Sequence, residues 1–298
     1  AVAAGEAVAT ATVWRVNAVP MALKLLMAHT TWVTATVAAA TCSGPRSVAW
    51  MGKRPDGSFS WWSYPLFAQW HILVPRYYLF KREVRRRRHQ EPVFTKVAEG
   101  WYIGGWPSSA DATPGGKNPA PPLEGTQDEA GRQRQATAKP GGTGLGRRRN
   151  AGSSDSSEGG ALAEPLLEQE EEHTGPPRPA LLDCTAELPR RMWDCPAYLC
   201  LPVYDCGAPT VAQLDEAVEW AAEQRAAGRE VLVHCANGHG RSATVLAACM
   251  LAQGLVQSPE EAESVMQRVR PLVKINSTQG ASLSAWWSER ERGAGESS

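Results

Sequence analysis

The stretch VLVHCANGHGRSATV, residues 231–245, decides the fold of this chain. Its apolar beginning predicts a short buried strand over 230–235, and the largely apolar residues 242–254 predict a helix. Gly238 and Gly240 lie in the loop between them and permit backbone conformations with positive φ. In such a loop the backbone N–H groups converge on one point, to which the helix N-terminus adds positive potential. The stretch therefore predicts a binding site for an anion.

Two side chains at the ends of this loop give the predicted site its chemistry. Cys235 ends the strand, and Arg241 follows at the beginning of the helix. The surroundings of the thiol favour its ionised form, and a planar guanidinium can bind two oxygens of a phosphate. We predict that Cys235 is an in-line nucleophile toward a phosphate bound by Arg241. The alternative is a buried cysteine in an ordinary strand–helix turn, whereas a P-loop nucleotidase is excluded because no Gly-Lys-Ser/Thr follows.

From Ala180 onward the chain alternates strand and helix signals. Thr210 is an expected helix N-cap, Gly228 an expected helix stop, and Pro259 suits the first position of a further helix. This order predicts an α/β domain with a central, mostly parallel sheet flanked by helices. A short strand and turn are expected in 93–106. The other expected strands are 180–188, 198–205 and 230–235, and the expected helices are 211–227, 242–254, one from Ser258 and one from near Thr278 through Trp287.

Composition divides the chain into segments. Residues 108–179 consist mainly of Gly, Ala, Pro, Ser, Arg and Glu, which cannot bury enough apolar surface to offset the entropy of ordering. The glycines of 141–147 follow no apolar strand and therefore do not predict a phosphate loop. The predicted segments are an Ala/Thr-rich leader that is a candidate membrane or targeting segment (1–49), an aromatic and basic membrane-proximal segment (50–92), the start of the folded domain (93–107), a disordered insertion (108–179), the catalytic core (180–290) and a disordered tail (291–298).

The leader contains one apolar stretch, LLMAHTTWVTATVAAAT at 25–41. It carries no formal charge when His29 is neutral. Its length is near the lower limit for a bilayer span, and its many threonines weaken that interpretation. Three interpretations stay open, namely a membrane span, the remnant of an organelle-targeting peptide and a loosely folded leader.

Residues 61–88 combine aromatic side chains with a run of cations that ends at Arg88. Pro65 and Pro75 are expected to break any long helix in this segment. Aromatic rings beside a cationic run suit the headgroup region of an anionic membrane, so we predict membrane contact through 61–88. The alternatives are a solvated basic helix packed on the domain and a nuclear localisation tract.

Charge and cysteine content exclude several classes of protein. The chain has 31 Lys and Arg against 31 Asp and Glu, and this balance argues against a nucleic-acid partner. The seven cysteines show no repeated pairing, which favours reduced thiols in an intracellular protein, cytoplasmic or organellar. Cys184, Cys195, Cys200 and Cys206 contain no Cys-x2-Cys pair, so neither a metal site nor a cofactor is expected. The oligomeric state is not indicated.

The residues HCANGHGRS, 234–242, satisfy in full the signature His-Cys-x5-Arg-Ser/Thr. With the preceding YDCGAPT, they make the chain resemble the cysteine-dependent tyrosine and dual-specificity phosphatases. The similarity is to the compact branch of plant and algal dual-specificity-like proteins and mitochondrial phosphatidylglycerophosphate phosphatases. It covers about residues 93–107 and 180–290, so the segment between them departs from the family.

The resemblance implies a role for each residue of the motif. Cys235 would form a phosphocysteine, Arg241 would bind phosphate and stabilise the transition state, and Ser242 would help the thiolate to leave. His234 would orient Cys235 by hydrogen bonds from behind the loop. The phosphate cradle would consist of the backbone amides of Ala236, Asn237, Gly238, His239, Gly240 and Arg241.

A carboxylate is needed to protonate the leaving oxygen and later to activate water. Asp205 is the candidate because it ends an expected strand, precedes a Gly207–Pro209 loop and stands at the spacing that the resemblance implies. Asp194, within Trp-Asp-Cys-Pro, is the alternative, although no Gly-x-Pro-Thr helix entry follows it. Asp183 and Asp215 are expected at a strand end and on a solvated helix face.

Two further residue types have open interpretations. His239 lies mid-loop, where lipid-directed relatives often carry a cation, so it is either a determinant of substrate choice or an exposed rim residue. Cys206 and Cys184 either trap Cys235 as a disulfide under oxidation or belong to the core.

The sequence thus predicts a metal-independent phosphatase that acts through a phosphocysteine intermediate. The first prediction for its partner is a phosphorylated protein, with phosphotyrosine and phosphoserine/threonine as substrates. One alternative is a membrane-associated phosphatase of a phospholipid, either phosphatidylglycerophosphate or a phosphoinositide. The other alternative is an inactive module that binds phospho-ligands.

Overall fold

The computed structural model describes residues 2–16, 19–107, 113–114 and 178–296. The predicted disordered insertion, 108–179, therefore lies almost wholly outside the described residues. The predicted disordered tail does not begin at 291, because a helix continues to Glu296. Leu283 and Trp286, earlier in that helix, pack in the core.

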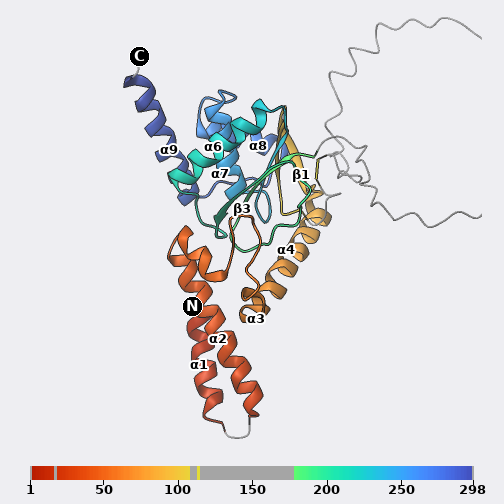
Figure 1. The fold of residues 1–298 in the computed structure, drawn as a ribbon, viewed down its shortest axis with the longest axis vertical. Helices are drawn as coiled ribbons and strands as arrows, with labels where there is room; N and C mark the ends of the chain where they lie inside the picture. Colours follow the sequence, from red (N-terminus) through yellow and green to blue (C-terminus); the bar gives the residue numbers. More distant parts are fainter. Residues whose placement is uncertain (1, 17–18, 108–112, 115–177, 297–298) are drawn as a thin grey trace, which may run out of the picture. The chain divides into compact units, whose positions relative to one another are not determined.

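A five-stranded sheet forms the centre of the domain (Figure 1). The strand order is β1-β2-β5-β3-β4, and only β1 and β2 pair antiparallel, as a hairpin that turns at Gly100. The remaining neighbours pair parallel, which confirms the predicted mostly parallel sheet. The strands are β1 (Phe94–Ala98), β2 (Trp101–Gly104), β3 (Ala180–Thr185), β4 (Tyr198–Val203) and β5 (Val231–His234).

Four helices pack around this sheet, with the largely apolar α7 (Arg241–Ala252) at their centre. Thr210 begins α6 with a capping box, in which its hydroxyl accepts from the Gln213 N–H while the Gln213 side chain accepts from the Thr210 N–H. Every residue from Arg241 to Leu251 is buried, because α7 packs on the sheet and on the three other helices. Those helices are α6 (Val211–Ala226), α8 (Pro259–Val269) and α9 (Ser277–Glu296).

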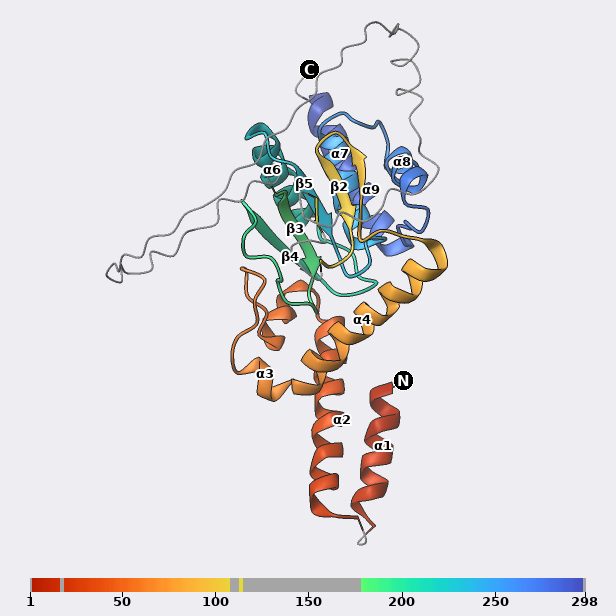
Figure 2. The same cartoon turned by 90° about the vertical axis from the view of Figure 1, so that its right-hand side faces the viewer.

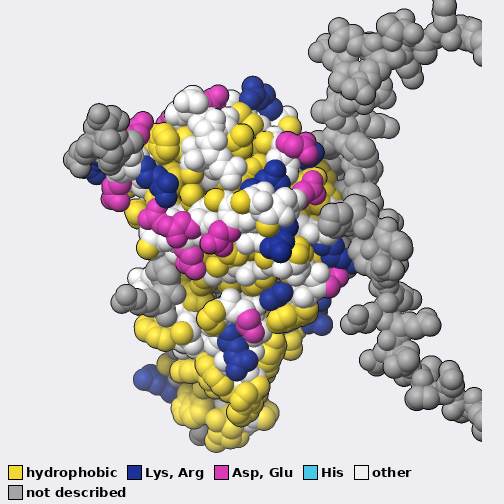
Figure 3. Space-filling view, turned by 45° about the horizontal axis from the view of Figure 1, so that its top comes forward, with side chains coloured by type: hydrophobic (Ala, Val, Ile, Leu, Met, Phe, Trp, Pro, Cys, Tyr) yellow, Lys and Arg dark blue, Asp and Glu magenta, His cyan; other side chains and the backbone are white. Residues whose placement is uncertain are grey.

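The segment before the sheet is largely helical. The apolar stretch 25–41 lies within α2, a 22-residue helix that is long and apolar enough to cross a membrane. Few of its side chains are buried, and Figure 3 shows hydrophobic side chains across the surface of this part of the molecule. The elements are α1 (Val2–Trp14), α2 (Met21–Cys42), the 3₁₀ helix η1 (Pro45–Met51), α3 (Ser63–Leu66) and α4 (Ala68–His89).

The expectation that Pro75 would break the helix is wrong, because Pro75 lies inside the 22-residue helix α4. Proline removes one N–H donor from the helix, at a cost of about 3 kcal/mol or more. Packing offsets this cost, since Val74 and Tyr78 of the same helix contact a buried cluster of the domain. The break occurs instead at Phe67, which separates α3 from α4 just after Pro65.

Buried contacts join the N-terminal segment to the sheet. The Lys53 ammonium lies 3.8 Å from the Asp183 carboxylate of β3 and donates to the Leu188 carbonyl, and all three residues are buried. Tyr78 of α4 packs with Trp106 and Leu188. Figure 2 shows α4 on the side of the sheet at which β3 and β4 end. The helix therefore lies where a parallel sheet presents its functional loops.

Candidate active site

The loop between β5 and α7 has a conformation that its glycines allow. Gly238 has φ +77°, and a Cβ built there would lie 2.5 Å from the Gly104 carbonyl carbon. Only glycine fits such a contact at a positive φ. The close approach to β2 turns the loop back over the end of β5, so that its amides surround the Cys235 sulfur.

Cys235 is almost fully buried at the floor of this loop. Its sulfur accepts a hydrogen bond from the Gly238 N–H at 3.2 Å and another from the Ser242 hydroxyl at 3.3 Å. Burial acts to raise the pKa of the thiol, but the charge of Arg241 and hydrogen bonds from Ser242 and the Asn237 backbone outweigh it and hold the pKa below its ordinary value. The arrangement favours a thiolate.

The guanidinium of Arg241 is held in place by a buried carboxylate. Glu187 accepts from both terminal nitrogens of Arg241, at 2.8 Å each, and the Val203 carbonyl accepts from one of them at 2.6 Å. Both side chains of the ion pair are at most 3% exposed. Sequence reasoning missed Glu187, because the expected strand 180–188 included it, whereas the observed strand ends at Thr185 and leaves Glu187 in the following loop.

Asp205 follows β4 and faces the same guanidinium. Its Oδ1 accepts from Arg241 at 3.1 Å, and its Oδ2 accepts from the hydroxyl of Tyr78 at 3.0 Å. Asp194, the alternative acid, pairs instead with Arg178 at 3.0 Å. The structure therefore brings Asp205 to the loop and leaves Asp194 in a different ion pair. Tyr78 was not anticipated, because it is distant from the motif along the chain.

Arg270, at the end of α8, holds the loop from behind. Its guanidinium donates to the carbonyls of Gly238 at 3.0 Å and Asn237 at 2.9 Å, and it is 2% exposed. Each of these carbonyls shares a peptide unit with the N–H of the next residue, which points the opposite way. Because Arg270 holds the carbonyls, these N–H groups face the cradle. Arg270 is a second residue that sequence reasoning missed, because nothing before folding connects α8 with this loop.

The two histidines of the motif have different surroundings. His239 contacts Glu91 through its Nε2 at 2.5 Å, and Glu91 also pairs with Arg270 at 3.1 Å. Burial lowers the pKa of His239 in spite of the Glu91 carboxylate, so the ring favours its neutral form. His234 is buried with Nδ1 at 3.8 Å from Asp183, and burial lowers its pKa as well. Of the two interpretations of His239, the exposed rim residue does not hold, since its side chain is only 15% exposed.

A cavity of about 200 Å³ opens above the Cys235 sulfur. Its wall includes the loop, Asp205 and Cys206, together with three cations from outside the loop, Lys81, Arg85 and Lys274. Two of these cations come from α4. In the described part of the chain no group of three or more potential metal ligands occurs. The redox role predicted for Cys184 and Cys206 stays a prediction, with Cys184 buried and Cys206 exposed.

Known proteins resemble this chain over the same region. Residues 185–284 match the family described as PTP-SAK, Swiss Army Knife protein, DSP-PTPase phosphatase domain. The mouse phosphatidylglycerophosphatase and protein-tyrosine phosphatase 1 is 40% identical over 73 residues, 24% of this chain and 37% of that protein. The Arabidopsis thaliana phosphatidylglycerophosphate phosphatase PTPMT1 is 35% identical over 74 residues, 25% of this chain and 22% of that protein.

Solved structures show similarity over a comparable share of the chain. The structure of PTPMT1 in complex with PI(5)P is 26% identical, covers 39% of this chain and 80% of that chain, and has a TM-score of 0.36. Similarity to the mouse and plant relatives spans well under half of each relative's length. The family match nevertheless includes Asp205, Cys235, Arg241 and Ser242, and it confirms the superfamily predicted from the motif. Residues 185–284 of this chain are thus similar to a phosphatase domain of the cysteine-dependent tyrosine and dual-specificity superfamily.

Proposed function

We propose that the domain hydrolyses phosphomonoesters, without a metal, through a phosphocysteine intermediate. The observation that carries the proposal is the Cys235 sulfur, which has a lowered pKa and accepts from Gly238 and Ser242 beside a buried Arg241. A thiolate beneath converging N–H groups is a nucleophile directed at a bound phosphate.

In the first step the Cys235 thiolate attacks phosphorus while the bond from phosphorus to the ester oxygen breaks. The loop amides from Ala236 to Arg241 and the Arg241 guanidinium bind the three other oxygens. Asp205 gives its proton to the leaving oxygen, so an alcohol departs and the phosphate stays on sulfur. Glu187 keeps the guanidinium in the plane that this binding requires.

In the second step water attacks the phosphocysteine and the S–P bond breaks. The Asp205 carboxylate takes a proton from that water, which returns Asp205 to its acid form. Ser242 donates to the departing thiolate from the position in which its hydroxyl already lies, 3.3 Å from the sulfur. Inorganic phosphate then leaves, and the cycle requires no cofactor.

Hydrolysis of p-nitrophenyl phosphate by the full chain tests this proposal. Activity should survive a chelator, should be inhibited by vanadate and should disappear in Cys235→Ser. The rate at which iodoacetamide alkylates Cys235 should rise with pH around a pKa below that of an ordinary thiol, since the reactive form is the thiolate. Cys249 is the internal control, because burial raises its pKa to about 12. Undiminished turnover in Cys235→Ser, or turnover without a phosphoenzyme in rapid-quench experiments, would overturn the phosphocysteine route. No turnover by the unmodified chain would leave only the phospho-ligand-binding module.

Two substrate classes suit this reaction, and the sequence favours a phosphorylated protein. A specific observation favours the second class, a phospholipid with a terminal phosphomonoester. Lys81 and Arg85 of α4 and Lys274 line the cleft beside the cradle, where they offer positive charge to a second anionic group of the substrate. The mouse and plant relatives are named as phosphatidylglycerophosphate phosphatases. The location also stays a proposal, namely intracellular and membrane-associated through 61–88 and α2.

A substrate panel separates the two classes. The full chain is assayed with a phosphotyrosine peptide, a phosphoserine peptide and phosphatidylglycerophosphate in anionic vesicles. If Lys81 and Arg85 bind a second anion, Lys81→Gln with Arg85→Gln should raise KM for the lipid more than for either peptide. Arg76→Gln, in the same helix but outside the cleft wall, is the matched control. Equal loss on all three substrates would contradict the lipid assignment.

A further inference from the structure

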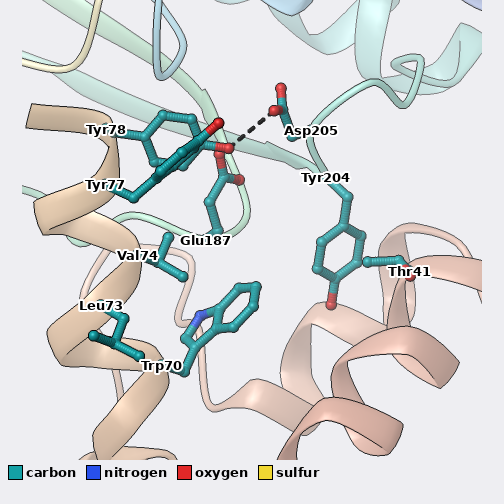
Figure 4. Close-up of a pocket in the computed structure, with 9 residues that line it drawn as sticks. All are labelled: Thr41, Trp70, Leu73, Val74, Tyr77, Tyr78, Glu187, Tyr204 and Asp205. Atoms are coloured by element: carbon teal, nitrogen blue, oxygen red, sulfur yellow. Dashed lines mark hydrogen bonds between the residues drawn. The ribbon is translucent and has the colours of Figure 1, made fainter. Parts of the chain in front are cut away.

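A second cavity, of about 320 Å³, lies between α4, the carboxyl end of α2 and the loop that carries Asp205. Figure 4 shows side chains from these three elements pointing into it. Most of its wall is aromatic or aliphatic. The side chains used below are Trp70, Leu73, Val74 and Tyr77 of α4, Thr41 of α2, and Tyr204.

This cavity adjoins the catalytic cleft at Asp205, the proposed general acid. Asp205 lines both cavities, and Tyr78, whose hydroxyl donates to Asp205, stands in the wall of the second one. In the proposed reaction Asp205 protonates the leaving oxygen. The group attached to that oxygen must therefore begin beside Asp205, which is where the apolar cavity begins. Its position assigns it to the leaving group of the substrate.

The surroundings of the cavity indicate the nature of that leaving group. Thr41, which closes one side, is at the carboxyl end of the helix that is long and apolar enough to cross a membrane. That helix packs on α1 and η1, but Met21, Leu25 and Leu26 toward its amino end stay exposed, so part of its apolar surface is open within the described chain. An exposed apolar surface of this kind marks contact with another molecule or with lipid. The cavity thus lies between an apolar helix and a phosphate cradle.

We propose that this cavity is a site for an alkyl or acyl chain of the substrate, and that the substrate is a lipid phosphomonoester. The inference rests on the proposed function, because it takes Asp205 as the group that protonates the leaving oxygen. The chain enters past Asp205 and packs on Val74, Tyr77 and Tyr204. A cavity of this volume is within the usual range for ligand pockets, about 300–1,000 Å³.

A homologous series of alkyl phosphates, from butyl to decyl phosphate, tests the site without a membrane. Each compound is used as a monomer, below the concentration at which it forms micelles, and kcat/KM is divided by that for p-nitrophenyl phosphate. A buried methylene contributes at most about a fourfold gain in kcat/KM. We expect the normalised kcat/KM to rise at least about tenfold across the series and then to level off as the cavity fills.

Two substitutions that fill the cavity give the variant test. Thr41→Trp and Leu73→Trp place an indole in the cavity from positions that are already exposed, so the fold should tolerate them. Both should remove most of the gain with chain length. Their neighbours Cys42 and Ile72 are also exposed and do not line the cavity, so Cys42→Trp and Ile72→Trp should keep the wild-type slope.

The outcomes separate this inference from the proposed function. No turnover of p-nitrophenyl phosphate would reject both. Turnover of p-nitrophenyl phosphate with no dependence on chain length would reject the chain site alone, as would an unchanged slope in Thr41→Trp and Leu73→Trp. A phosphotyrosine peptide that surpasses decyl phosphate and loses as much activity in Thr41→Trp would assign the cavity to a peptide and overturn the proposal.

Discussion

Helices α7 and α4 meet at the same cleft but are held in opposite ways. In α7 every side chain from Arg241 to Leu251 is buried, whereas in α4 only Tyr78 is buried. The first helix is thus fixed by the apolar core, and the second by a small number of contacts with the domain. In the proposed reaction, the phosphate is thus held at the amino end of the buried helix, while α4 contributes side chains around the rest of the substrate.

The largest expected effect concerns the acid that lies between the two helices. Asp205→Asn should reduce kcat about 10²–10⁴-fold for alkyl phosphates, because their poor leaving oxygens need the proton. The loss should be much smaller for p-nitrophenyl phosphate, which has a good leaving group. Steady-state kinetics on both substrates measure the difference. Asp194→Asn is the matched control and should keep wild-type activity, and full activity of Asp205→Asn on alkyl phosphates would show that the acid is another residue.

The second prediction concerns the buried ion pair behind the cradle. Glu187→Gln leaves the Arg241 guanidinium without its charged partner at a site where both side chains are at most 3% exposed. Removal of one member of a buried pair costs about 3–5 kcal/mol of unfolding free energy. Urea denaturation measures it. Glu99→Gln, which removes an exposed partner of Lys96, should leave the unfolding free energy almost unchanged. Similar values for both variants would mean that the core does not depend on this pair.

The third prediction separates close packing from backbone strain. Gly238→Ala adds a Cβ 2.5 Å from the Gly104 carbonyl carbon at φ +77°, so the loop must move. We expect kcat/KM to fall about 10²-fold, because small displacements of a preorganised site are costly. Gly254→Ala has a similar φ, +66°, but its Cβ would meet nothing within 4 Å. It should lose about 1 kcal/mol of stability and keep full activity. Equal activities would show that the loop absorbs the clash.

The smallest expected effect tests whether α4 acts on the chemistry at all. Tyr78→Phe removes the hydroxyl that donates to Asp205 at 3.0 Å. A hydrogen bond of this kind contributes about 1 kcal/mol, so kcat for alkyl phosphates should fall about fivefold. The neighbouring Tyr77 is 55% exposed, and Tyr77→Phe should have no effect on p-nitrophenyl phosphate. A Tyr78→Phe enzyme with wild-type kcat would restrict α4 to substrate binding.

Sequence alone determined the elements around the motif. The strands near 180, 198 and 231 and the helices from Thr210, Ser242 and Ser258 are close to their predicted positions. Their hydrophobic periods and caps are local signals, which each segment carries by itself. The superfamily was also readable, because a strand, two glycines and an arginine at fixed spacing leave little freedom for the loop. The expected helix break at Pro75 was wrong, because the low helix propensity of proline is a local property and does not include the tertiary packing that outweighs it.

Tertiary structure alone decided which distant side chains complete the site. Glu187, Arg270 and Tyr78 come from three different parts of the chain, and tertiary packing brings each of them to the site. No period or spacing in the chain records such contacts, because they depend on how remote helices and strands pack together. The same holds for the burial of Lys53 against Asp183, within the segment 50–92 that composition predicts to be membrane-proximal. Local pattern specifies the elements and the reactive sulfur, and the packing of remote segments specifies its partners.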